Sequence, residues 1–199
     1  MAGELAIGHG GLVARPAHGL AQGAEGCEEK RVRVIGLVGG IGSGKTTATE
    51  ILVDLGARVL NADTIGHEVY APGTPGFDAV ARAFGREVVG DDGRIDRRRL
   101  GAIVFAEPAR LAELNGIVHP LIKAEIQRRI DEARGTPGVR AVVVEAAILL
   151  EAGWRGLVDE VWVICADPEH VVRRLREQRA LEASEVGARI ARQMSDAER

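Results

Sequence analysis

The sequence predicts an α/β protein with three layers, in which a parallel β-sheet lies between two layers of α-helices. Short apolar segments alternate with helical patterns along the chain, and this alternation is typical of parallel strands joined by helical crossovers. The first apolar segment also ends in glycines that lead directly into a helical pattern, at residues 39–46. Ligands bind beyond the carboxyl ends of strands in such sheets, so we expect the functional site at that edge.

The predicted elements follow one another from residue 32 onward. Residues 32–38 are an apolar stretch that fits a buried strand. Residues 46–55 have a helical period, and Gly56 stands where helices commonly end. The other stretches that fit strands are residues 58–60, 140–144 and 161–164.

A helical insert is predicted at about residues 64–135, between the second and the third strand. The Pro-Gly-Thr-Pro sequence at residues 72–75 indicates a loop. The pattern from residue 96 to about residue 130 is helical, and Pro120 within it fits the first turn of a new helix. We interpret this insert as the substrate-side subdomain.

The two ends of the chain differ in pattern. Residues 1–30 show neither a helical nor a strand period, so we interpret them as a flexible N-terminal extension. Residues 31–199 are expected to form one folded domain. Its last part is predicted to be helical, from Pro168 to about residue 178 and again over residues 184–194.

Composition argues against several classes of function. Apolar residues make up 46% and charged residues 28%, as in ordinary globular proteins, and the net charge of −3 indicates no nucleic-acid or membrane partner. No stretch approaches the ~18 apolar residues of a membrane span, and a signal peptide is not evident, so a cytoplasmic location is expected. Cys27 and Cys165 indicate no disulfide framework or metal site. A monomer or a weak homo-oligomer is expected.

Residues 39–46 match the phosphate-binding pattern G-x-x-x-x-G-K-T, with a strand before it and a helix after it. Glycines let successive backbone amides point inward at phosphate oxygens, and the helix N-terminus adds partial positive charge. Lys45 is placed to reach the β- and γ-phosphates of ATP, and the Thr46 hydroxyl to bind Mg²⁺. The predicted ATP-binding residues are Gly40, Gly42, Ser43, Gly44, Lys45, Thr46 and Thr47.

Two carboxylates at strand ends are candidates for the chemistry. Asp63 follows the second strand and could accept a proton from a substrate hydroxyl, or it could be the N-cap of the next helix. Glu145 ends the third strand and could orient Mg²⁺ through water, or it could be a solvated side chain. The residue types alone leave both alternatives open.

Basic side chains form the remaining candidates. Arginines including Arg174 and Arg179 crowd the last segment, where they could form a lid over the transferring phosphate or a solvated helical face. His119 precedes Pro120 and could be structural or functional, and His67 lies one turn after Asp63.

Taken together, these segments resemble dephospho-CoA kinases over about residues 32–199. The phosphate loop is widely shared, but its combination with Ala-Asp at 62–63, Pro-Gly-Thr-Pro at 72–75 and His-Pro-Leu-Ile at 119–122 is specific. The resemblance implies transfer of the ATP γ-phosphate to the ribose 3′-hydroxyl of dephospho-CoA, which is the last step of coenzyme A synthesis. It implies a P-loop fold with five parallel strands, a helical CoA domain and a lid.

The resemblance also assigns roles to residues. It implies that Asp63 is the general base and that residues 174–194 form the lid, with Arg174 and Arg179 as candidates for contact with phosphate. Lys45 belongs to the implied catalytic set as well. The implied substrate-side residues are Asp63, His67, His119, Pro120, Leu121 and Glu145.

Three features depart from the family pattern. Asn61 stands where the family usually has aspartate, and Gln178 stands where a second lid arginine is common. Family members also continue beyond the matched region with a fifth strand, so only four of the five expected strands are predicted here, and the last of them is expected to be an open, apolar edge.

Other functions remain as alternatives. The fold could serve another nucleoside or small-molecule kinase, or a remnant that binds nucleotide without activity. A GTPase-like switch is disfavoured, because no Asn/Thr-Lys-x-Asp guanine-reading motif occurs in the sequence.

Overall fold

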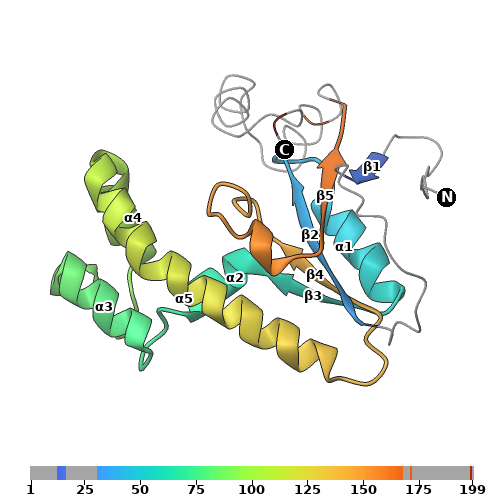
Figure 1. Cartoon of the computed structure of the whole chain (residues 1–199). Helices are drawn as coiled ribbons and strands as arrows, with labels where there is room; N and C mark the ends of the chain where they lie inside the picture. Colours follow the sequence, from blue (N-terminus) through green and yellow to red (C-terminus); the bar gives the residue numbers. More distant parts are fainter. Residues whose placement is uncertain (1–12, 17–30, 168–170, 172–197, 199) are drawn as a thin grey trace. The chain divides into compact units, whose positions relative to one another are not determined.

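The computed structural model describes residues 13–16, 31–167, 171 and 198, and it divides the chain into two compact units (Figure 1). The first unit comprises Met1–Leu60 together with Glu132–Arg199 and carries the β-sheet. The second unit, Asn61–Asp131, has only helices as its regular structure. The second unit corresponds to the predicted helical insert, with boundaries that differ by three or four residues.

The first unit is built on a sheet in the order β1-β5-β2-β4-β3. β2 (Arg33–Gly39) is its central strand and pairs in parallel with both β4 (Ala141–Glu145) and β5 (Glu160–Cys165). β3 (Ala57–Asn61) lies beyond β4. The four strands that the sequence predicts are therefore present, and β2 ends in the glycine-rich loop.

A further strand, β1 (Val13–Pro16), lies inside the segment that we expected to be a flexible extension. It pairs antiparallel with β5, and Val13 stands opposite Cys165 while Pro16 stands opposite Trp162. The prediction that β5 has an open edge is therefore wrong, because the backbone of β1 occupies that edge. Strand pairing over such a short segment is a tertiary effect that local sequence patterns do not report.

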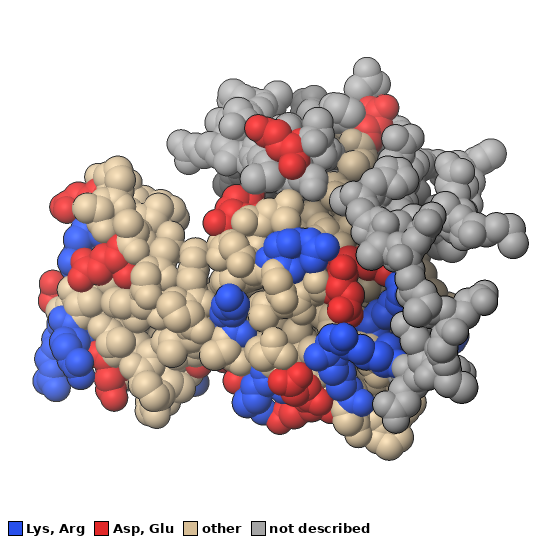
Figure 2. Space-filling view, viewed as in Figure 1, with Lys and Arg blue, Asp and Glu red and all other residues tan. Residues whose placement is uncertain are grey.

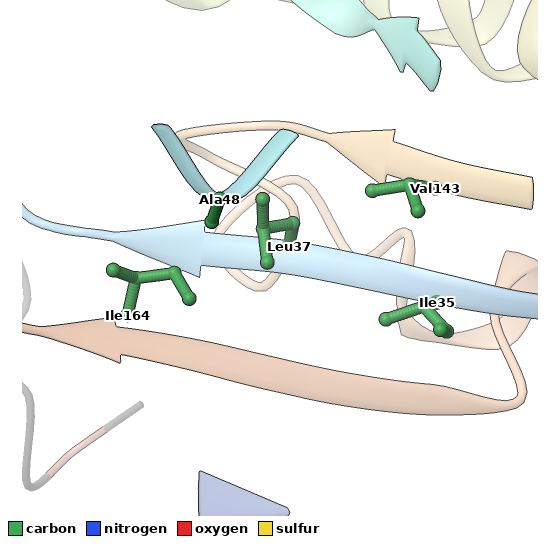
Figure 3. Close-up of a cluster of buried hydrophobic side chains, with 5 residues drawn as sticks. All are labelled: Ile35, Leu37, Ala48, Val143 and Ile164. Atoms are coloured by element: carbon green, nitrogen blue, oxygen red, sulfur yellow. The ribbon is translucent and has the colours of Figure 1, made fainter. Parts of the chain in front are cut away.

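One face of the sheet packs on α1 (Lys45–Asp54) through a cluster of aliphatic side chains (Figure 3). Ile35 and Leu37 of β2 lie between Val143 of β4 and Ile164 of β5, and Ala48 contributes from α1. Ile35 and Leu37 are two residues apart, as expected because side chains alternate between the faces of a strand. This packing holds the start of α1 directly against the end of β2.

On its opposite face, β2 meets the segment between β4 and β5, which includes the short helix η2 (Arg155–Leu157). A Cβ at Gly36 would come within 2.8 Å of the Leu149 side chain and within 3.2 Å of Val158. Glycine is therefore required at this position of β2 because those side chains already occupy the space. Trp154, which has 2% of its surface exposed, is buried in the same segment.

The second unit contains the helices α2 (Ala62–Glu68), α3 (Pro75–Phe84), α4 (Arg97–Ala106) and most of α5 (Pro108–Arg134), with the short η1 (Arg86–Val88). Side-chain oxygens cap three of these helices. Asn61 accepts a hydrogen bond from the Thr64 amide at α2, and Asp96 accepts two from the first turn of α4. Such caps supply acceptors for amides that have none within the helix.

The Pro-Gly-Thr-Pro sequence forms the turn between α2 and α3. Gly73 has φ of 83°, a conformation that glycine adopts readily, and Pro75 is the first residue of α3. The Thr74 hydroxyl accepts from the Phe77 amide at 3.1 Å and lies 2.9 Å from the Val69 carbonyl, to which it can donate. This motif is therefore accounted for by the geometry of the turn.

The prediction that a new helix begins at Pro120 is wrong, because α5 continues through that residue. Proline has no amide for the carbonyl four residues earlier, which belongs here to Gly116, and its ring crowds that carbonyl. Packing outweighs this cost, since α5 buries a stripe of side chains spaced four residues apart. The stripe consists of Val118, Ile122, Ile126 and Ile130.

No helix among the described residues is long and apolar enough to cross a membrane. On the face shown in Figure 2, basic and acidic side chains are interspersed over the described surface. That face does not show the continuous basic stripe that nucleic-acid binding favours.

Candidate active site

The glycine-rich loop connects the end of β2 to the start of α1, as the sequence predicted. Gly42 has φ of 73° and Gly44 has φ of 102°, both in the region that glycine adopts without strain. A Cβ at Gly39 would lie 2.6 Å from the Ile164 carbonyl oxygen and 2.7 Å from Ser43 Oγ. The loop can therefore adopt this path only with glycine at Gly39.

The ammonium group of Lys45 lies over this loop. Its Nζ donates to the carbonyl oxygens of Gly39, at 2.9 Å, and of Gly40, at 3.0 Å. These contacts hold a positive charge at the phosphate-binding loop before any ligand binds. An ammonium held in this way is positioned to bind a polyphosphate, because the flexible lysine side chain loses less conformational entropy when the ligand binds.

Ser43 is 3% exposed, and its hydroxyl oxygen has no hydrogen-bond partner among the described residues. A buried hydroxyl without a partner is costly, so such groups are commonly explained by a ligand or water. A phosphate oxygen in the loop would provide the acceptor that the hydroxyl lacks. This is the clearest structural indication that the loop is built for an anion.

The N-terminus of α1 supports the same conclusion. Gly44 is its N-cap, no side chain caps the helix, and the first turn contains no acidic residue. The leading amides of a helix have no acceptor within it, and they carry partial positive charge. Thr46 and Thr47 are both exposed in this first turn. The arrangement fits an anion bound at the helix start.

The sequence predicts that this loop binds ATP together with Mg²⁺, and the donor groups that the described residues offer are compatible with that ion. The described residues contain no cluster of three or more His, Cys, Asp or Glu side chains suited to a metal. Mg²⁺ usually keeps several waters and uses one or two protein ligands together with substrate phosphates. Glu145 ends β4 opposite Leu37, two residues before Gly39, and is half-buried at the same end of the sheet as the Thr46 hydroxyl.

Asp63 lies in the first turn of α2, two residues after the end of β3, and its side chain is exposed. The alternative that Asp63 is the N-cap of this helix is wrong, since the cap is Asn61, whose side-chain oxygen lies 3.0 Å from the Thr64 amide. Asn61 thus fills the place of the usual family aspartate with an equally good capping group. The Asp63 carboxylate is not needed for the cap.

His67 lies one turn after Asp63 on α2 and contacts the guanidinium of Arg97, the first residue of α4. Arg97 Nη1 is 2.7 Å from His67 Nε2 and 3.2 Å from Nδ1. Burial and the nearby Arg97 charge lower the pKa of His67, while Asp63 acts in the opposite direction. Tyr70 packs edge-to-face on the same ring, and its own pKa is raised by burial.

Residues 97–99 are a run of three arginines, and the sequence alone does not show which of them meets His67. Which side chain faces His67 depends on the residue at which α4 begins. Asp96 sets that point by capping α4. An aspartate immediately before a basic helical segment was the available signal.

The predicted residues around Pro120 lie on α5. His119 is half-buried, and burial lowers its pKa. Leu121 lies against Gly76, because a Cβ there would be 2.9 Å from Leu121 Cδ1. Pro120 is exposed. Contacts of these three residues with a substrate stay a prediction, and Arg174 and Arg179 lie outside the described residues.

A parallel sheet whose central strand ends in a lysine-bearing glycine loop, with a helix directly after it, defines the class of P-loop nucleoside-triphosphate-binding proteins. Within that class, the model of one family, CoaE or dephospho-CoA kinase, matches residues 33–199. The chain belongs to the dephospho-CoA kinase family.

Individual relatives agree with this assignment. A dephospho-CoA kinase of Symbiobacterium thermophilum is 47% identical over 164 residues, which cover 82% of this chain and 68% of that protein. One from Dehalococcoides mccartyi is 44% identical over 169 residues, covering 84% of each.

Solved structures show the same fold. The crystal structure of TT1252 from Thermus thermophilus superposes with a TM-score of 0.71 at 32% identity, covering 84% of this chain and 83% of that one. A dephospho-CoA kinase from Campylobacter jejuni, at 23% identity and a TM-score of 0.54, supports the fold alone; it covers 81% of this chain and 79% of its own.

Proposed function

We propose that this chain transfers the γ-phosphoryl group of ATP to the ribose 3′-hydroxyl of dephospho-CoA, giving CoA and ADP in the last step of coenzyme A biosynthesis. The family match over residues 33–199 supports the reaction. The observation that carries the proposal is the buried Ser43 hydroxyl, which lacks a partner in a loop where Lys45 already holds a positive charge. These groups suit the phosphates of ATP.

The loop residues bind and orient the nucleotide. Lys45 contacts the β- and γ-phosphates, and the leading amides of α1 stabilise the charge that spreads over the phosphate oxygens during transfer. Mg²⁺, when bound, would neutralise part of this charge, and the Thr46 hydroxyl and Glu145 would hold it, the latter through water. Arg174 and Arg179 are proposed to add positive charge from the lid and to help exclude water.

Asp63 acts on the acceptor. Its carboxylate accepts the proton of the 3′-hydroxyl as that oxygen forms a bond to the γ-phosphorus. The bond from the γ-phosphorus to the β–γ bridging oxygen breaks, and ADP leaves with that electron pair. His119, Pro120 and Leu121 are proposed to lie beside the acceptor. We also propose a cytoplasmic location and a monomeric or weakly homo-oligomeric state.

Substitution of the base tests this function. Asp63→Asn should lower turnover about 100-fold or more, because general-base catalysis typically contributes that much, while ATP binding stays nearly unchanged. CoA formation from ATP and dephospho-CoA should be followed by mass spectrometry, and ATP affinity by calorimetry.

Lys45→Ala is the matched comparison, since it should weaken both ATP binding and turnover. Full turnover in Asp63→Asn would show that the base is another group. Failure of the wild-type protein to form CoA under saturating ATP would contradict the proposed function itself.

A further inference from the structure

His67 and Arg97 bring two helices of the second unit together, and no carboxylate of the described residues pairs with the arginine. The Arg97 guanidinium lies within 3.2 Å of both ring nitrogens of His67, although the two residues are thirty positions apart. Both side chains are exposed, so a ligand can reach them. Tyr70 packs against the imidazole and limits its movement.

The pairing of Arg97 differs from that of other arginines in this unit. Arg99, Arg110 and Arg129 each form an ion pair with a carboxylate. Among the described residues, Arg97 has no carboxylate within ion-pair distance, and its guanidinium contacts an imidazole instead. Two groups that can both be cationic repel each other when both carry charge, so this pair suits an anion that accepts from both.

The position of the pair identifies which anion fits. His67 follows Asp63 by four residues on α2, and side chains at that spacing are about 5–6 Å apart on one helix face. In dephospho-CoA, one methylene joins the 5′-diphosphate to the ribose that bears the reacting 3′-hydroxyl. Asp63, as the base for that hydroxyl, and the His67–Arg97 pair, one helical turn away, are therefore spaced to contact the ribose and the 5′-diphosphate of the same dephospho-CoA molecule.

We propose that His67 and Arg97 together bind the 5′-diphosphate of the acceptor. The inference rests on the proposed function, because it takes Asp63 to face the acceptor hydroxyl. Arg97 donates through its planar fork, which matches phosphate geometry. His67 donates as an imidazolium, so acceptor binding takes up a proton there. Asp63, Arg97 and Tyr70 are the titratable or charged groups that act on His67.

The sign of the pH dependence follows from this uptake. The bound diphosphate raises the pKa of His67 above its lowered value in the free protein. Acceptor affinity is therefore highest at pH values below the free pKa, and it falls as pH rises through the pKa of the complex. ATP affinity, which depends on the loop of the other unit, should not follow this profile through His67.

Four variants test the proposal. Arg97→Ala should raise the KM for dephospho-CoA roughly tenfold or more, as expected for loss of charge-assisted hydrogen bonds, and leave the KM for ATP nearly unchanged. Arg98→Ala is the matched control, because it removes the same charge from the next, exposed residue of α4. His67→Gln should flatten the pH dependence of the KM for dephospho-CoA. Arg97→Lys keeps the positive charge but not the planar guanidinium, so its KM for dephospho-CoA should lie between those of the wild type and Arg97→Ala. This variant replaces Arg97→Ala in the test if Arg97→Ala does not fold.

A binding measurement separates this inference from the proposed function. The His67 imidazole should be followed by NMR during titration with inorganic pyrophosphate, with His67→Gln to assign its signal. Its pKa should rise in the wild type and in Arg98→Ala, but not in Arg97→Ala. No rise in the wild type, or equal effects of Arg97→Ala and Arg98→Ala on the KM, would overturn the inference even if CoA is formed. Absence of CoA formation would overturn the function instead.

Discussion

Two buried hydroxyls close together in the first unit have opposite hydrogen-bonding states. Thr49 Oγ1 donates to the Thr46 carbonyl at 2.7 Å, whereas Ser43 Oγ has no partner among the described residues. Both residues are less than a tenth exposed. The first hydroxyl stabilises the fold, whereas burial of the second costs free energy that we propose a phosphate of ATP offsets.

This contrast predicts different effects of removing each hydroxyl. Ser43→Ala should leave the Tm of the free protein unchanged or slightly higher, because it removes an unpaired buried group, and should weaken ATP binding roughly tenfold. Thr49→Val is the matched control and should cost about 1 kcal/mol of unfolding free energy. Thermal unfolding with and without ATP measures both effects. A large drop in the Tm of free Ser43→Ala would mean that the hydroxyl has a structural partner.

Among the helices, α2 is tied to α5 by a small charge network. Arg129 of α5 pairs with Glu68 of α2 and with Glu125, which also bonds Arg128. Hydrogen bonds from Arg128 and then Arg129 lower the pKa of Glu125 to about 2. Because α2 carries Asp63 and His67, this network also fixes the helix whose residues we propose to face the acceptor.

The network predicts a specific acid sensitivity. The pKa of Glu125 falls from 4.5 to about 2 on folding, so its stabilisation is complete above pH 4.5 and is lost as pH falls toward 2. Glu125→Gln should therefore show a smaller loss of Tm across this range than the wild type. Glu50→Gln, at an exposed position of α1, should keep the wild-type slope. Parallel curves for Glu125→Gln and the wild type would contradict this account.

Regular elements with strong local signals were predictable from the sequence, and long-range pairings were not. The loop at residues 39–46 was recognisable because a strand, glycines, a lysine and a helix must follow one another there. The continuity of α5 through Pro120 was not, since a buried stripe outweighs one lost hydrogen bond. The contact of Arg97 with His67 depends on how two helices pack, and the sequence signals only where α4 begins, through the Asp96 cap.

At the scale of the molecule, β1 adds a fifth strand to the sheet that the described residues form. β1 occupies the edge of β5 that the sequence led us to expect as exposed. An unpaired edge of this kind is a template for association with other chains. β1 therefore protects one edge of the sheet that carries the phosphate loop.

Deleting residues 1–16 tests this protection. Amide hydrogen exchange across β5 should become faster, and the protein should aggregate more readily, because the backbone groups facing β1 lose their partners. Exchange in β3 at the other edge is the internal control and should not change. Unchanged exchange in β5 would show that β1 does not protect it.

The cap at Asn61 has a consequence for acidification. An amide does not titrate, so the hydrogen bond from Asn61 to the Thr64 amide keeps its strength when carboxylates become protonated. The cap of α4 behaves differently. The Asp96 carboxylate accepts hydrogen bonds from the Arg99 and Arg98 amides, and these bonds lower its pKa. Once the carboxylate is protonated, it is a weaker acceptor for those amides. Acid should therefore loosen the start of α4 while the passage from β3 into α2 stays intact.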